Sequence, residues 1–278
     1  MTDLRSTLAT TGPIDLTSIA SDSTPEFAGG KKDAKLALPE IGAQLMELQE
    51  LLFANGRAGT TDRKVLMLLQ GMDTSGKGGT LRHVAGLVDP QGVLITAFKA
   101  PTEEERRQDF LWRIEKEVPP AGMIGVFDRS HYEDVLIGRV RELAPAEEIE
   151  RRYDAINDFE RRFVDTGGVL LKCFLHISPQ DQKERLAERL DDPTKYWKYN
   201  PGDLDEREMW DKYQEAYEIV LDRCSTPYAP WHVVPAGRKW YRNWAIATML
   251  GETLAELGLQ WPPADFDVEH EKRRLATM

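Results

Sequence analysis

The chain has 278 residues but only two cysteines, Cys173 and Cys224. Cys173 lies in the apolar run 169–176, so we expect a thiol in the protein core and no disulfide framework. The five histidines and two cysteines also lack the spacing of metal ligands. No zinc site is therefore predicted.

Long apolar segments and an excess of positive charge are missing as well. No apolar stretch approaches the ~20 residues that span a bilayer, and the N-terminus lacks a basic region followed by an apolar core. The net charge is −11, so no general basic field attracts nucleic acid, and a polyanionic substrate would need a local basic groove. These absences predict a cytoplasmic protein that binds neither membranes nor nucleic acid.

Apolar runs and amphipathic patterns alternate along the chain, and hydrophobic residues make up 41% of it. This alternation is typical of parallel strands joined by helices that cover both faces of a sheet. Strands are expected at residues 64–69, 92–98, 123–128, 169–176 and 231–234. Helices are expected from about residue 39, from the capping box at 102–105 to before residue 119, over 145–164, after residue 178 and over 238–257. The sequence predicts one three-layer α/β domain with a central parallel sheet of about five strands.

The first 37 residues are rich in Ser, Thr, Asp and Gly. They are predicted to form an N-terminal arm ahead of a domain at residues 38–278. Leu16, Ile19 and Phe27 are the arm residues that can dock on this domain.

The segment from Gln70 to Thr80 is a glycine-rich turn between the first strand and a helix. Its spacing, Gly71-x4-Gly76-Lys77, fits the phosphate-binding P-loop except that Gly78 replaces the usual Ser or Thr. Lys77 is expected to neutralise a phosphoryl group in transfer. Asp73 is expected to bind Mg²⁺ or position the acceptor, and the alternative is that it caps its own loop. The expected phosphate-binding residues of the loop are Thr74, Ser75, Gly76, Gly78, Gly79 and Thr80.

A second motif follows the strand at 123–128. Asp128 at the end of this strand fits the Walker B position, where a carboxylate binds Mg²⁺ directly or through water. Arg129 can form a fork to phosphate oxygens. The alternative is that Asp128 and Arg129 pair with each other and cap the next helix. His131 is expected to be structural, because phosphoryl transfer needs little from a general base.

Residues 179–210 carry basic side chains between two helical patterns and are predicted to form a helical lid. Arg185 and Arg189 lie four residues apart on one helix face, so both are expected to reach phosphates. Lys195 and Lys198 are expected to contact nucleotide or polyphosphate. The alternative is a solvated charged face, in which nearby glutamates pair with these cations.

The two motifs together resemble the family-2 polyphosphate kinases. The resemblance rests on residues 71–84 and 127–134, and also on 98–105, 109–113, 193–198 and 203–210, so it runs from about residue 40 to 255. It implies a P-loop kinase fold with a helical lid. It also implies reversible, Mg²⁺-dependent phosphoryl transfer between polyphosphate and a nucleotide.

By this resemblance Asp73 and Asp128 are the catalytic carboxylates near the metal, Lys77 and Arg129 are phosphate ligands, and Arg185 and Arg189 are lid arginines. Ser75 and Asp128 resemble the subgroup that accepts both AMP and ADP, with guanine nucleotides as further candidate acceptors. Relatives of this type also imply a homo-oligomer, either a dimer or a tetramer.

Two other functions are compatible with a P-loop. An ATP-dependent nucleoside monophosphate kinase would use the lid as its phosphate clamp. A non-catalytic nucleotide switch has less support, because Gly78 removes the magnesium hydroxyl and the chain has no guanine-reading Asn-Lys-x-Asp sequence.

Overall fold

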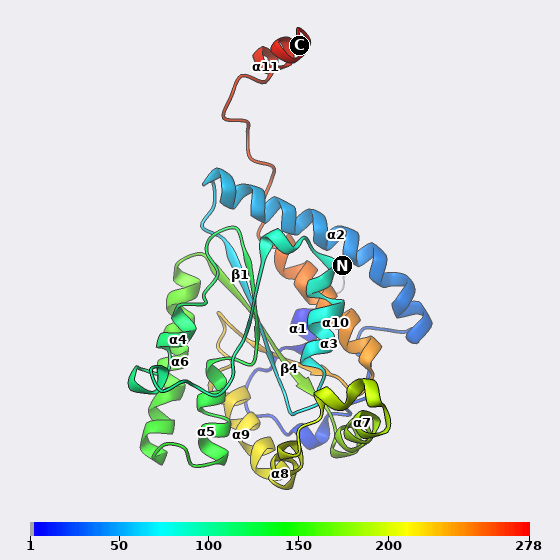
Figure 1. Cartoon of the computed structure of the whole chain (residues 1–278), viewed down its shortest axis with the longest axis vertical. Helices are drawn as coiled ribbons and strands as arrows, with labels where there is room; N and C mark the ends of the chain where they lie inside the picture. Colours follow the sequence, from blue (N-terminus) through cyan, green and yellow to red (C-terminus); the bar gives the residue numbers. More distant parts are fainter. Residues whose placement is uncertain (1–2) are drawn as a thin grey trace.

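The computed structural model describes residues 3–278 and is built on a parallel β-sheet (Figure 1). The strand order is β2-β3-β1-β4-β5, and every pairing is parallel. The strands are β1 (Lys64–Gln70), β2 (Val93–Ala97), β3 (Ile124–Asp128), β4 (Gly168–His176) and β5 (Trp231–Pro235). The predicted parallel α/β sheet of five strands is confirmed.

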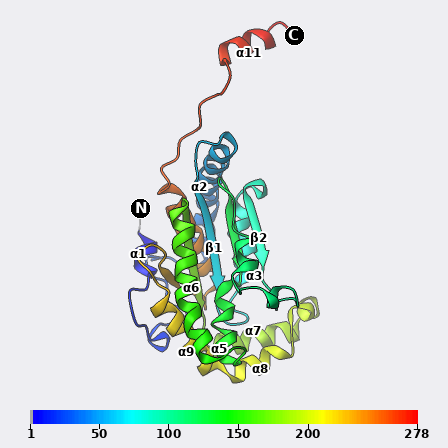
Figure 2. The same ribbon diagram turned by 90° about the vertical axis from the view of Figure 1, so that its left-hand side faces the viewer.

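Helices cover both faces of this sheet (Figure 2). The helices of the described chain are α1 (Leu4–Leu8), α2 (Lys31–Ala58), α3 (Lys77–His83), α4 (Trp112–Glu115), α5 (Ile137–Val140), α6 (Ala146–Asp165), α7 (Pro179–Asp191), α8 (Gly202–Glu208), α9 (Trp210–Arg223), α10 (Lys239–Ala255) and α11 (Val268–Leu275), of which α11 lies apart from the sheet. Short 3₁₀ turns lie at Leu16–Ser18, Ala85–Leu87, Pro90–Gly92, Glu105–Arg107, His131–Asp134 and Pro193–Lys198. None of the described helices is both long and apolar enough to cross a membrane.

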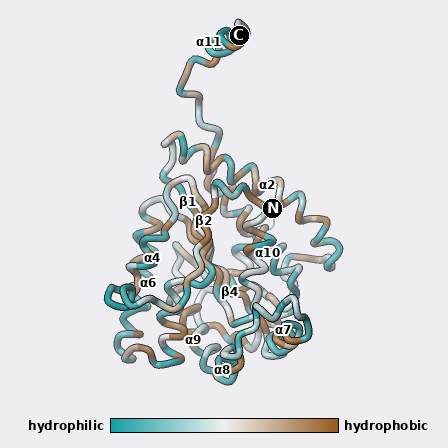
Figure 3. Tube along the Cα trace, in the orientation of Figure 1, coloured by the Kyte–Doolittle hydropathy of each residue, from teal (hydrophilic) through white to brown (hydrophobic). Residues whose placement is uncertain are grey.

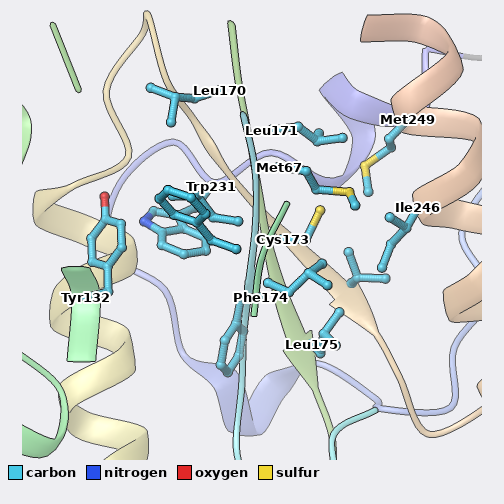
Figure 4. Close-up of a cluster of buried hydrophobic side chains, with 14 of the residues drawn as sticks. Met67, Tyr132, Leu170, Leu171, Cys173, Phe174, Leu175, Trp231, Ile246 and Met249 are labelled. Atoms are coloured by element: carbon cyan, nitrogen blue, oxygen red, sulfur yellow. The ribbon is translucent and has the colours of Figure 1, made fainter. Parts of the chain in front are cut away.

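The core lies on both sides of the central strands, where hydrophobic residues are concentrated (Figure 3). Successive side chains of a strand point to opposite faces. Met67 and Leu171 are accordingly directed toward Ile246 and Met249 of α10, whereas Trp231 lies on the other side of the sheet (Figure 4). All five residues are buried, so the central strands have no solvent-facing side.

Two predicted helices differ from the observed ones. Helix α2 begins at Lys31, not near Pro39. Pro39 removes one hydrogen bond on the exposed face, where water can satisfy the freed carbonyl, while Ala34 anchors the first turns by burial. The helix predicted after Thr102 is interrupted. The capping box with Glu105 forms, at 2.6 Å and 3.2 Å, but Asp109 Oδ1 accepts from the Leu111 amide at 2.9 Å and starts a new short turn.

The N-terminal residues pack on the body. The Thr10 amide donates to the Trp231 carbonyl at 2.8 Å, beside an antiparallel bridge between Ala9 and β5. Leu16 is buried as expected. The Phe27 ring packs 4.6 Å from the Trp244 ring, centroid to centroid. This segment covers the β5 side of the sheet, and helix α2 follows it directly.

A buried polar cluster joins β4, α6 and the turn after β3. Lys172 Nζ donates to Glu160 Oε2 at 2.6 Å, to the Tyr132 hydroxyl at 3.0 Å and to the Cys224 carbonyl at 2.7 Å. Burial tends to raise the pKa of Glu160, but the Lys172 ammonium and His131 outweigh it and hold that pKa below its ordinary value. Because Tyr132 and His131 belong to the turn after β3, this cluster fixes that turn to the core.

Removing one partner of this buried pair should destabilise the fold strongly. Lys172→Met leaves the Glu160 carboxylate buried and unpaired, which is expected to lower the free energy of unfolding by about 3–5 kcal/mol. Equilibrium unfolding in urea measures the change. The matched control is Lys272→Met, which breaks an exposed Lys–Glu pair on α11 and should cost less than about 1 kcal/mol. Equal effects of the two variants would contradict this assignment.

Candidate active site

The glycine-rich loop leaves the carboxyl end of β1 and returns at α3. Its backbone requires unusual conformations, with φ of +146° at Gly71, +67° at Thr74 and +110° at Gly76. A Cβ atom on Gly71 would lie 2.7 Å from the Leu175 carbonyl oxygen. The Thr74 and Ser75 hydroxyls are buried without a hydrogen-bond partner among the described residues. A strained loop with unpartnered buried polar groups is typical of a ligand site, and this loop shape suits an anion.

Lys77 lies over this loop. Its Nζ donates to the Gly71 carbonyl at 2.7 Å and approaches the Met72 carbonyl at 3.4 Å. Desolvation and the Arg129 guanidinium lower the pKa of Lys77, while Asp73 and Asp128 oppose the shift. The ammonium is therefore held among loop carbonyls and two carboxylates, within reach of any anion in the loop.

The register of the sheet brings the second motif to the first. Leu69 of β1 lies opposite Asp128 of β3, so both strands end at one edge. Arg129 follows with φ +65°, a strained value for a residue with a side chain. Its Nη2 donates to Asp73 Oδ1 at 2.9 Å, and its Nη1 donates to Glu133 Oε2 at 3.3 Å. In this structure Arg129 pairs with Asp73 across the site and not with Asp128.

A cavity of about 230 Å³ opens in front of this cluster. It is lined by residues of the loop, the turn after β3, the lid and α9: Gly71, Met72, Asp73, Arg129, Glu133, Leu136, Ile137, Asn200, Gly202, Asp203, Glu206, Tyr213 and Tyr217. Burial and the Asp73 carboxylate raise the pKa of Asp203, so these two acids lie close in space. The sequence assigned no role to Glu133 or Asp203.

The lid residues reach different surroundings. Arg185 is buried, and its two terminal nitrogens donate to the carbonyls of Thr74, Ser75, Ala236 and Gly237. In this arrangement Arg185 supports the glycine-rich loop from behind. Arg189 donates to the Lys198 carbonyl at 2.8 Å and to Asp203 Oδ2 at 3.1 Å. Both bonds therefore join parts of the lid to each other.

The lid lysines face solvent. Lys195 pairs with Asp192 at 3.1 Å. Lys198 Nζ lies 4.9 Å from the centre of the Trp197 ring, whose side chain is itself exposed. Neither lysine lines the cavity, so the prediction that they contact nucleotide or polyphosphate remains a prediction.

Arg242 of α10 is a residue that the sequence did not single out. It is 3% exposed, and its Nη1 donates to the Ser75 carbonyl at 3.2 Å. A Cβ atom on Gly76 would lie 1.6 Å from the same Nη1, so Gly76 must be glycine for this arginine to fit. Burial lowers the pKa of Arg242 to about 10, with Arg185 adding to the shift, so the side chain stays charged at neutral pH.

Arg242 has no carboxylate partner among residues 3–278; its other hydrogen bonds go to the Asn243 side chain. Two guanidinium groups, Arg185 and Arg242, therefore lie beneath the loop. Asp181, Glu184 and Glu188 partly compensate the charge of Arg185, whereas no carboxylate among the described residues compensates Arg242. A buried unpaired charge is unfavourable unless an opposite charge approaches. An anion bound in the loop would supply this opposite charge. The contact between Arg242 and the loop could not be predicted from the local sequence of α10, because the two are far apart along the chain.

Comparisons with known proteins point to one family. The family model described as Polyphosphate kinase 2 (PPK2) matches residues 31–258. A Meiothermus ruber protein named AMP/ADP-polyphosphate phosphotransferase is 48% identical over 251 residues, which are 90% of this chain and 92% of that protein. A Rhodopseudomonas palustris protein named ADP-polyphosphate phosphotransferase is 37% identical over 79% of this chain and 78% of its own length. The crystal structure of polyphosphate kinase 2 from Arthrobacter aurescens superposes with a TM-score of 0.97 at 52% identity, covering 99% of this chain and 97% of that one.

Removing the charge beneath the loop should weaken anion binding without unfolding the protein. Arg242→Met is expected to weaken binding of inorganic tripolyphosphate by about tenfold, equivalent to about 1.4 kcal/mol, because a nearby positive charge is lost from a poorly solvated site. Isothermal titration calorimetry measures the affinity. The free energy of unfolding without ligand should change little, since lost hydrogen bonds are offset by removal of an unpaired charge. Arg242→Lys keeps the charge and should retain most of the affinity; wild-type affinity in Arg242→Met would contradict the assignment.

Proposed function

We infer that this chain, which belongs to the polyphosphate kinase 2 family, is a polyphosphate:nucleotide phosphotransferase whose acceptors are AMP and ADP. The observation that carries this proposal is the 48% identity, over nine tenths of both chains, to a relative named for AMP and ADP. Relatives named for ADP or for NDP support nucleotide transfer in general. Guanine nucleotides are further candidate acceptors.

The proposed chemistry needs positive charge more than it needs a base. In phosphoryl transfer, negative charge is spread over the oxygens of the transferred group, and catalysis consists mainly of positioning and electrostatic stabilisation. We assign Lys77 and Arg129 to this role. Lys77 can exchange its bonds to the Gly71 and Met72 carbonyls for bonds to phosphate oxygens. Arg129 can turn from Asp73 to the same phosphates.

The amides and hydroxyls of the loop hold the phosphate chain in this proposal. The contacts come from Thr74, Ser75, Gly76, Gly78, Gly79 and Thr80. The unpartnered Thr74 and Ser75 hydroxyls support this assignment, as does the positive charge of Arg185 and Arg242 behind the loop.

We assign Asp73 and Asp128 as the ligands of a magnesium ion. Among residues 3–278, no group of three or more His, Cys, Asp or Glu side chains is arranged as a metal site. Mg²⁺ fits this donor set, because it is commonly held by one or two carboxylates together with substrate phosphates. When bound, Mg²⁺ supplies positive charge to the phosphates. Asp73 also pairs with Arg129, so a magnesium ion held by Asp73 would lie next to this guanidinium.

The lid segment at residues 200–206 contributes four residues to the wall of the cavity. Closure of this segment over bound phosphates would exclude water and so favour transfer to a nucleotide over hydrolysis. Arg189 supports this role because it ties Lys198 to Asp203 within the lid. We also place the protein in the cytoplasm and propose that it self-associates as a dimer or tetramer.

An ATP-dependent nucleoside monophosphate kinase would use the same loop, carboxylates and lid. The names of the relatives do not favour it, since each specifies polyphosphate as the phosphoryl partner.

Replacing Lys77 should abolish transfer while leaving the fold intact. Lys77→Ala is expected to lower kcat about a thousandfold, because a charged donor aimed at the transferred group is lost. The readout is ATP formed from ADP and polyphosphate. The matched control is Lys64→Ala at the opposite end of β1, where Nζ donates to the Thr166 carbonyl and lies 5.6 Å from the centre of the Phe163 ring, away from the loop. Near-normal activity of Lys77→Ala, with an unchanged circular dichroism spectrum, would refute the role of the loop.

The choice of donor separates the two enzyme functions. With polyphosphate and Mg²⁺ as the only additions, AMP should yield ADP and then ATP, and chelation of the metal should stop both steps. GMP and GDP are tested in the same way. Product analysis by liquid chromatography gives the result. Conversion of AMP with ATP as donor, together with no conversion by polyphosphate, would establish the nucleoside monophosphate kinase instead.

A further inference from the structure

The C-terminal tail, residues 261–278, leaves the body of the molecule (Figures 1 and 2). Its last tie to the body is a hydrogen bond from Asn55 Nδ2 of α2 to the Gln260 carbonyl at 2.8 Å. Beyond this point, the only hydrogen bonds and ion pairs in the described structure are local ones within residues 267–278. The tail nevertheless carries large apolar side chains: Trp261, Phe266 and Leu275 are 55%, 59% and 74% exposed.

The Arthrobacter aurescens crystal structure aligns with 99% of this chain, so the alignment includes most of the tail. A chain end without contacts to its own domain is normally disordered. Contacts with another molecule would order the tail and cover its exposed apolar side chains.

Helix α2, beside which the tail leaves, has a second apolar surface. Leu36, Pro39, Ala43 and Met46 follow the 3-4-3 spacing that places side chains on one face of a helix. All four are exposed, Leu36 by 69% and Met46 by 51%. We call these four residues the α2 seam. The inward face of α2 instead packs Leu45 and Leu52 into the core, so the seam lies on the outside of the molecule.

We propose that the α2 seam pairs with the same seam of a second copy of this chain, and that the two tails are exchanged across this interface. An antiparallel arrangement with its two-fold axis near Ile41 places Leu36 against the partner's Met46, and Pro39 against the partner's Ala43. The small side chain of Ala43 lets the helices approach closely. A self-complementary patch of this kind is what a two-fold dimer requires. This inference rests on the proposed self-association and names the surface that produces it.

Charges agree with the same register. Lys32 and Glu50 continue the line of the α2 seam at its two ends, and both are exposed without an ion pair within residues 3–278. The antiparallel register places Lys32 against the partner's Glu50. Two such pairs form, one on each side of the axis.

The tail meets a complementary surface as well. In this register Leu51 lies opposite the partner's Lys31, and Asn55 lies opposite the partner's position 27, about one turn ahead of the first residue of that helix. The tail starts there, because Gln260 is bonded to Asn55. Its first part is acidic, with Asp265, Asp267, Glu269 and Glu271 before any basic residue. The first turns of α2 are basic, with Lys31, Lys32 and Lys35 exposed around one carboxylate, Asp33.

A charge exchange tests the register. Lys32→Glu and Glu50→Lys each place two like-charged pairs across the interface and should weaken dimerisation by about tenfold or more. The double variant Lys32→Glu/Glu50→Lys restores opposite charges and should return toward wild-type affinity. Sedimentation equilibrium of the full chain measures the dissociation constant. Rescue by the double variant is a result that unfolding or a general loss of charge cannot produce.

Two further variants test the apolar contacts and the tail. Met46→Glu should dissociate the dimer, whereas Leu143→Glu, at a residue that is 67% exposed but outside α2 and the tail, should not. A chain that ends at Gln260 should dimerise more weakly while retaining its circular dichroism spectrum.

The outcomes separate this inference from the proposed activity. A wild-type chain that remains monomeric at about 50 µM in sedimentation equilibrium would overturn both the interface and the proposed self-association. A wild-type dimer that persists unchanged in Met46→Glu and in both single charge variants would overturn the α2 interface alone. Polyphosphate-dependent transfer is measured in parallel, so an active monomer would leave the proposed reaction standing.

Discussion

The distribution of charge around one backbone loop governs the site. The protein carries a net charge of −11, yet Lys77 and Arg129 lie at the front of the loop and Arg185 and Arg242 lie behind it. Carboxylates face the front cations, whereas Arg242 is left without one. Carboxylates thus compensate the cations at the front of the loop, and a bound anion would compensate the charge of Arg242 behind it. The positive side chains that would attract phosphate therefore surround a backbone loop whose shape already suits an anion.

The acidic side of the site has the complementary role. Asp73 is bonded to Arg129, and Glu133 is bonded to the other nitrogen of the same guanidinium. These two carboxylates keep Arg129 in place, and Arg129 is the one cation among the residues that line the described cavity. Because the lid supplies Asp203 and Glu206 to the cavity wall, movement of the lid changes the electrostatic balance at the phosphates as well as their access to water.

The rigidity of this arrangement comes from the core. The turn that carries Arg129 continues into His131 and Tyr132, and both contact the buried Glu160. Lys172 of β4 completes that cluster, so the strand next to β1 holds the turn that follows β3. On the opposite face, α10 carries Arg242 and also packs on α2. The helix that supports the loop is thus joined to the surface that we propose as the dimer interface.

The sequence by itself determined the five parallel strands, the loop with Lys77, and the position of Asp128 and Arg129 at the end of β3. These features depend on local composition, since buried strands are apolar throughout and phosphate-binding turns need glycine at fixed spacing. The sequence did not determine the roles of Arg185, Arg242 and Glu133, or the early start of α2 at Lys31. Each depends on a partner distant along the chain: Arg242 meets the loop more than 160 residues earlier, and Arg185 meets carbonyls from two separate loops. Only the packing of helices on the sheet brings such groups together, because a buried guanidinium takes its role from the atoms around it and not from its neighbours in sequence.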